Sequence, residues 1–136
     1  GNYQGYVTKS FTINRADISS CTVTLSDESL TYTGSSLRPT ATVKSGDKEL
    51  TLNQDYYVSY RNNWDAGTAS AILTGTGNYT GSVTRDFTIK PLDINRYSAS
   101  LSQYSYTSDG TEKCPDVTVT YGDKTLATGT DFTVSY

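Results

Sequence analysis

Two cysteines, Cys21 and Cys114, are the most reactive side chains of this 136-residue chain, which has no histidine and no methionine. Histidine is the commonest general base, the commonest metal ligand and the usual partner of a serine or cysteine nucleophile. The sequence also shows no paired-carboxylate signature of a glycosidase. We therefore predict that the protein is not an enzyme and that it carries no cofactor and no metal.

A group of aromatic residues is the first candidate for a binding site. Trp64, the only tryptophan, lies among turn-forming residues, which predicts a loop. An exposed aromatic ring can stack on the apolar face of a sugar, and Tyr57, Tyr104 and Tyr106 would extend such a site into an outward strip for a glycan or a protein. The alternative is that Trp64 packs on its neighbours and that the 12 tyrosines fill the core and rim of a β-protein with few phenylalanines. We favour this second interpretation.

The acidic residues offer a candidate calcium site, formed from Asp27, Glu28, Asp47, Asp55 and Asp65. Their spacing fits no known calcium-binding loop. Two of them recur at a fixed distance along the chain, which favours turn capping over metal binding.

Charge and hydropathy exclude two classes of partner. The formal net charge is -3, so no basic surface is predicted for nucleic acid. No apolar run is long enough to cross a bilayer, so we predict no membrane insertion. The first residues lack the basic and apolar regions of a signal peptide, and we expect any secretion signal to lie outside this sequence.

An internal repeat is the main signal in the sequence. Residues 1–13 recur as residues 77–89, and residues 55–60 recur as residues 131–136, both at an offset of 76. The same offset relates three further pairs without any insertion: Asp17-Ile18 with Asp93-Ile94, Gly46-Asp47-Lys48 with Gly122-Asp123-Lys124, and Pro39 with Pro115. A fixed period of this length indicates one structural unit repeated along the chain.

The repeated segments predict β-strands. Tyr56, Val58 and Tyr60 alternate with polar positions, so we expect them to face inward and Tyr57 to face outward. Lys9 and Arg85 interrupt an apolar face at equivalent places, where a long basic side chain would snorkel or a bulge would turn it out. No segment has a helical apolar period. Short strands separated by frequent turns predict an all-β, immunoglobulin-like β-sandwich.

Five motifs stand out within the repeat: Leu-Thr-Tyr-Thr-Gly (30–34), Asp-Tyr-Tyr-Val-Ser-Tyr-Arg-Asn-Asn (55–63), Ala-Gly-Thr-Ala (66–69), Gly-Thr-Gly-Asn-Tyr-Thr-Gly (75–81) and Phe-Thr-Ile (87–89). Together they resemble a bacterial immunoglobulin-like repeat of Gram-positive surface and secreted proteins. The resemblance covers essentially the whole chain and places Phe-Thr-Ile at the end of a unit. It implies a terminal strand of a preceding repeat over 1–13, a complete repeat over 14–90, and a partial second repeat over 91–136 that lacks its last strands.

The resemblance also implies a function. Such repeats stand in tandem, so the chain is expected to be a non-catalytic structural or spacer module of an extracellular bacterial protein that supports adhesion, with neighbouring repeats as partners. The alternative is an immunoglobulin-like module that binds carbohydrate or a host surface protein.

The cysteines fit this repeat poorly. At an offset of 76, Cys21 corresponds to Tyr97 and Cys114 corresponds to Arg38. A disulfide suits an oxidising compartment, but one built into the fold would recur in each copy, and bonded cysteines need Cα atoms within about 7 Å. We favour two separate thiols, with a Cys21–Cys114 disulfide as the alternative.

The correspondence of residues 1–13 with a strand predicts a further partner. These residues match a closing strand of the repeat, so we expect them to add to the open edge near residues 132–136 of another molecule. The result would be a strand-addition dimer.

Overall fold

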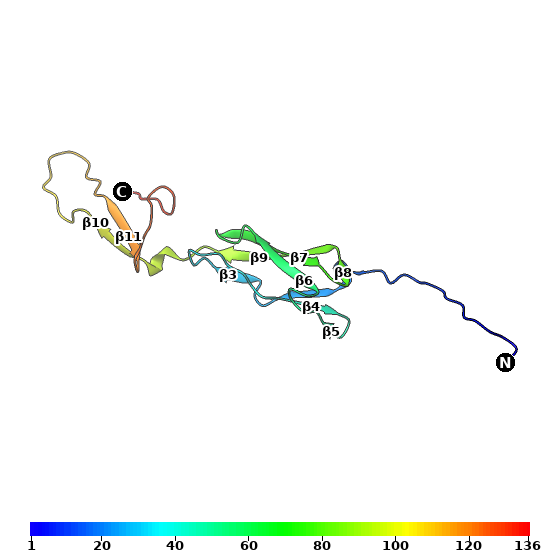
Figure 1. Cartoon of the computed structure of the whole chain (residues 1–136). Coiled ribbons are helices and arrows are strands. Elements are labelled where there is room, and N and C mark those ends of the chain that lie inside the picture. Colours follow the sequence, from blue (N-terminus) through cyan, green and yellow to red (C-terminus); the bar gives the residue numbers. More distant parts are fainter. The chain divides into compact units, whose positions relative to one another are not determined.

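The structure, a computed structural model, describes all residues from 1 to 136 and separates into two compact units, residues 1–92 and 93–136. The boundary follows Leu92, two residues after the predicted end of the complete repeat. Regular structure is almost entirely β-strand, with two short 3₁₀ turns (Figure 1). The predicted all-β class is therefore confirmed. Neither helical turn is long and apolar enough to cross a membrane.

Unit 1 contains nine strands and one 3₁₀ turn. In chain order they are β1 (Ala16–Asp17), η1 (Ile18–Ser20), β2 (Thr22–Leu25), β3 (Ser29–Thr31), β4 (Ala41–Ser45), β5 (Lys48–Glu49), β6 (Tyr56–Arg61), β7 (Gly67–Gly75), β8 (Tyr79–Thr80) and β9 (Ser82–Lys90). The strands form a sheet of order β2-β4-β5, a sheet of order β3-β9-β7-β6, and a separate β1-β8 pair. Figure 1 shows β6, β7 and β9 running side by side.

The alternation predicted for residues 56–60 is present in β6. Tyr56 is buried, Val58 and Tyr60 are partly buried, and Tyr57 is exposed. The antiparallel register pairs Val58 with Leu73 of β7, which is fully buried. A one-residue slip of this register would move Tyr56 to the solvent side, so the apolar pattern fixes the pairing.

The core of unit 1 lies between its two larger sheets. Val23 of β2 and Val43 of β4 belong to the same buried cluster as Tyr56 of β6 and Leu73 of β7. Ile18 of η1 joins this cluster and is fully buried. A second cluster consists of Ala69, Phe87 and Ile89, with Leu25, Leu30, Tyr32, Leu37 and Tyr60 packed against it.

Arg85 occupies the place where a basic residue interrupts an apolar face. The pairing of β9 with β7 runs from Thr88 to Ser82 in continuous register, so no bulge is present. The exposed guanidinium reaches back to the main chain, with its Nε donating to the carbonyl of Val23 at 3.4 Å. Of the two predicted solutions, the structure therefore contains the snorkelling side chain.

Two parallel pairs join the beginning of unit 1 to its end. β1 pairs with β8, and β3 pairs with β9. Asp17, at the end of β1, caps η1 by accepting a hydrogen bond from the Ser19 amide at 2.9 Å. A Cβ atom on Gly81, between β8 and β9, would stand 2.5 Å from Oδ1 of Asp17. The cap and the β8–β9 connection therefore fit closely together.

Unit 2 is smaller and contains η2 (Ile94–Arg96), β10 (Ser98–Leu101), β11 (Val117–Tyr121) and β12 (Lys124–Thr125), in one sheet of order β10-β11-β12. Val119 is its buried hydrophobic residue. The pairing of Ser98 with Thr120 repeats, 76 residues later, the pairing of Thr22 with Lys44 in unit 1.

The N-terminal segment, residues 1–15, contains no strand or helix, and all of its residues are exposed. Its Tyr3, Tyr6, Val7, Phe11 and Ile13 are among the most exposed large side chains of the molecule.

Candidate functional site

Trp64 lies on the loop between β6 and β7, as its neighbours predict, and 54% of it is exposed. The residue before it is anchored, because the Asn63 side-chain amide donates to the Leu37 carbonyl at 2.9 Å and the Leu37 amide donates to the Asn63 carbonyl at 2.7 Å. Tyr57 points outward from β6 in the same unit and is about half exposed. Trp64 and Tyr57 are thus both exposed aromatic rings of unit 1, and Trp64 lies on a loop with a fixed base.

Tyr104 and Tyr106 belong to unit 2 and are also exposed. The Tyr104 hydroxyl accepts a hydrogen bond from the Leu101 amide at 3.1 Å. The four predicted aromatic residues are therefore divided between two units, two in each. The structure does not bring them together as one strip within a unit.

Both cysteines are free thiols in the structure. Cys21 is buried in the core of unit 1, and Cys114 is exposed in unit 2. Two separate thiols, with a Cys21–Cys114 disulfide as the alternative, stay a prediction, which mass spectrometry without reduction can test.

The acidic residues come together in no group of three or more that could hold a metal ion. Asp55 instead caps a turn, since its Oδ2 accepts from the Thr51 amide at 2.9 Å. Asp131 makes the same contact with the Ala127 amide at 2.8 Å. Both contacts agree with the turn capping that the sequence favoured.

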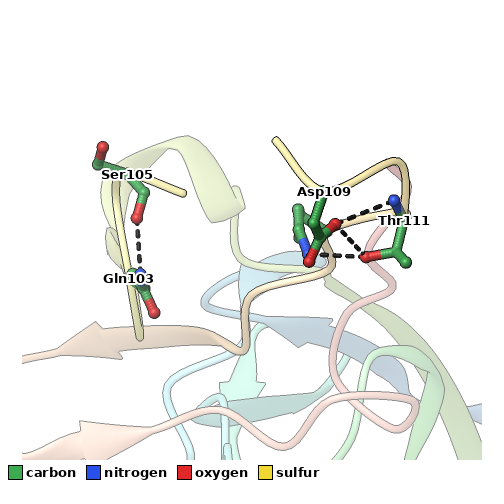
Figure 2. A network of polar contacts seen from close by, with 5 residues as sticks. Gln103, Ser105, Asp109 and Thr111 are labelled. Carbon is green, nitrogen blue, oxygen red and sulfur yellow. Dashed lines mark hydrogen bonds and ion pairs between the residues drawn. The ribbon is translucent and has the colours of Figure 1, made fainter. Parts of the chain in front are cut away.

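A polar network in the loop between β10 and β11 was not anticipated from the sequence (Figure 2). Asp109 accepts from the Thr111 hydroxyl at 2.6 Å and from the Thr111 amide at 3.0 Å, and it forms an ion pair with Lys113 at 2.5 Å. These donors, led by Lys113, lower the pKa of Asp109 to about 2. These contacts hold the carboxylate within its own loop. An aspartate followed by glycine and threonine is typical of such a turn, and this signal was present in the sequence.

A set of local hydrogen bonds recurs at the offset of 76. The Tyr60 hydroxyl donates to the Pro39 carbonyl at 2.7 Å, and the Tyr136 hydroxyl donates to the Pro115 carbonyl. Burial raises the pKa of the partly buried Tyr60 hydroxyl. The other recurring contacts are Asp17 with Ser19 and Asp93 with Asn95, Ser26 with Thr40 and Ser102 with Asp116, and Asp55 with Thr51 and Asp131 with Ala127.

An open pocket lies beside β4 and β5 of unit 1. Glu49 is the one charged residue in its lining, beside Thr42, Leu50 and Tyr56. The Tyr56 hydroxyl is already used, because it donates to the Ala41 carbonyl at 2.9 Å. The pocket therefore offers no set of converging polar groups for a ligand or a reaction.

No protein-family model, curated protein or solved structure matches this chain.

Proposed function

We propose that this chain is a non-catalytic structural module of a bacterial cell-surface or secreted protein, in which immunoglobulin-like β-sandwich repeats stand in tandem and support adhesion. The observation that carries the proposal is the recurrence of side-chain contacts 76 residues apart, of which the Tyr60–Pro39 and Tyr136–Pro115 pairs are the clearest. A chain that repeats both its sequence and its local contacts is suited to building a length of similar units.

The strand pairing of unit 1 supports a mechanical role. The strands near its start, β1 and β3, run parallel to β8 and β9 near its end. A pull on the two ends of the unit therefore acts along these pairs and strains several hydrogen bonds together. The bonds include the Thr88 amide to the Glu28 carbonyl and the Tyr32 amide to the Lys90 carbonyl, both at 2.9 Å. Such pairing suits a spacer that is held under tension at a cell surface.

The second candidate function is binding of a glycan or a host protein through unit 1. The exposure of Trp64 on an anchored loop favours it, since tryptophan offers a flat apolar face to a sugar ring. We rank this function below the structural one, because the candidate aromatic residues are divided between the two units.

A binding assay of the full chain separates the two functions. The structural proposal predicts no specific binding on a glycan array or to immobilised host matrix proteins. Trp64→Ala and Tyr3→Ala are matched variants, because both remove an exposed aromatic ring but only Trp64 belongs to the candidate site. A glycan that binds the chain and is lost with Trp64→Ala, but not with Tyr3→Ala, would overturn the spacer-only proposal.

The proposed location is tested independently. An antibody raised against the chain should stain intact cells of the source organism or detect the parent protein in the culture medium. Staining that appears only after permeabilisation would contradict an extracellular role.

A further inference from the structure

A turn with a central glycine occurs in both units. It consists of Thr33-Gly34-Ser35 in unit 1 and of Asp109-Gly110-Thr111 in unit 2, at the offset of 76. Both glycines have a φ of +79°, a left-handed conformation that favours glycine. In each copy the side chains on either side of the glycine share a hydrogen bond, at 3.0 Å in unit 1 and at 2.6 Å in unit 2. The turn is therefore a local feature of the repeat.

The two copies of the turn differ in their chemistry. Unit 1 has a hydroxyl group on each side of the glycine, whereas unit 2 has a carboxylate directly before it. An aspartate followed by glycine can cyclise, because glycine has no side chain that hinders its amide nitrogen. Asp109 and Gly110 are both exposed, and nothing lies within 4 Å of the position that a Cβ atom on Gly110 would take. No packed neighbour therefore hinders a reaction at this peptide bond.

The reaction needs no further reactant. The Gly110 amide nitrogen attacks the carboxyl carbon of Asp109 and forms a bond to it, and the hydroxyl group of the protonated carboxyl leaves as water with the amide proton. Water then opens the resulting succinimide ring at either of its two carbonyl groups. One opening restores aspartate. The other gives isoaspartate, in which the main chain runs through the former side-chain carbonyl and gains one methylene group.

The surroundings of Asp109 oppose this reaction. Lys113 donates to Oδ2 of Asp109 at 2.5 Å, and Thr111 donates to Oδ1 through its amide at 3.0 Å and through its hydroxyl at 2.6 Å. Lys113 also donates to the Thr111 hydroxyl at 2.7 Å, which closes the network in Figure 2. Both carboxylate oxygens are thus held, and these contacts, led by that of Lys113, lower the pKa of Asp109 to about 2. The carboxyl group is therefore restrained and rarely protonated near neutral pH.

We propose that the Asp109-Gly110 bond is a site of succinimide and isoaspartate formation, and that Lys113 and Thr111 hold it in an unreactive state. Leu37 takes the place of Lys113 in unit 1, where no aspartate precedes the glycine. The carboxylate and the cation thus occur in the same copy of the turn, which agrees with a protective role of the lysine. The added methylene group of isoaspartate would change the geometry of the turn, so the network keeps the loop chemically durable.

Isoaspartate formation in the full chain tests the proposal. Peptide mapping with electron-based fragmentation distinguishes aspartate from isoaspartate at residue 109. At about pH 5, Lys113→Met should form isoaspartate at least about 5-fold faster than the wild-type chain, because loss of the cation raises the pKa of Asp109 and increases its protonated fraction. Lys113→Arg keeps the charge and should stay close to the wild-type rate. Lys48→Met is the matched control, since it removes the same charge from an exposed residue of unit 1.

Thr33→Asp provides an unprotected copy of the same turn. Thr33 is exposed, so unit 1 should keep its fold, which the fluorescence of Trp64 can check. The introduced aspartate has a serine two residues later but no lysine four residues later. It should isomerise at least about 5-fold faster than Asp109 in the same molecule. The proposal is overturned by equal rates at residue 109 in the Lys113→Met and Lys48→Met chains, or by an aspartate at position 33 that reacts as slowly as Asp109.

Discussion

At the scale of a single residue, Tyr60 shows how one side chain can join two parts of the fold. Its hydroxyl donates to the Pro39 carbonyl at 2.7 Å while its ring packs against Phe87. Tyr136 repeats the hydrogen bond to Pro115 but remains exposed. The same bond therefore sits in two surroundings, one partly buried and one open to water. Since water competes for exposed donors, the two bonds differ in what they contribute to stability.

Tyr60→Phe should lower the free energy of unfolding of unit 1 by about 1 kcal/mol, the usual contribution of a partly buried hydrogen bond. The ring is retained, so packing on Phe87 is kept. Urea unfolding followed by the fluorescence of Trp64, the only tryptophan, reports on unit 1 alone. Tyr136→Phe is the control and should leave this transition in place. Equal effects of the two variants would show that burial does not set the strength of the bond.

At the scale of elements, β1, η1 and the β8–β9 connection fit closely together. Gly81 has a φ of +76° and faces the Asp17 carboxylate, which caps η1. Gly46, between β4 and β5, has a similar φ of +61°, but nothing lies within 4 Å of its missing Cβ. Both glycines therefore need a left-handed backbone conformation, but an added Cβ would clash with a neighbouring side chain only at Gly81.

Gly81→Ala should destabilise unit 1 by about 1 kcal/mol more than Gly46→Ala does, because the added methyl group displaces Asp17 and breaks its cap. Thermal unfolding of the two variants measures the difference. In an Asp17→Ala background the extra cost should vanish, since no carboxylate remains to be displaced. An extra cost that survives in this background would show that the clash is with the main chain.

The sequence predicted the local elements of the fold better than their long-range order. The alternation of Tyr56, Tyr57 and Val58 was sufficient to orient β6, because one strand face must meet the core. The capping role of Asp55 followed from its recurrence as Asp131, 76 residues later in the chain. The parallel β1–β8 and β3–β9 pairs join segments about 60 residues apart, and no local pattern specifies such partners.

The candidate site was predictable only in part, because a local sequence pattern does not specify which distant residues share a surface. A loop position for Trp64 follows from its turn-forming neighbours, and its exposure agrees with that position. Whether Tyr57, Tyr104 and Tyr106 share a surface depends on which unit holds each of them, which is a property of the whole chain. The Asp109 network needed only local chemistry, an aspartate two residues before a threonine and four before a lysine.

At the scale of the whole molecule, the two units differ in how much apolar surface they bury. The core of unit 1 draws residues from β2, β4, β6, β7, β9 and η1, whereas Val119 is the buried hydrophobic residue of unit 2. Burial of apolar surface is the dominant stabilising contribution to folding. The strands β10 and β11 should therefore open more readily than β7 and β9, although β10 and β11 pair in the same register as β2 and β4.

Hydrogen exchange measured by mass spectrometry should show this difference directly. At low protein concentration, amides of β10 and β11 should exchange at least about 10-fold faster than those of β7 and β9, because local opening costs less where few apolar contacts are broken. Equal protection of both units would contradict this prediction, and would mean that the stability of unit 2 does not follow from its buried apolar surface.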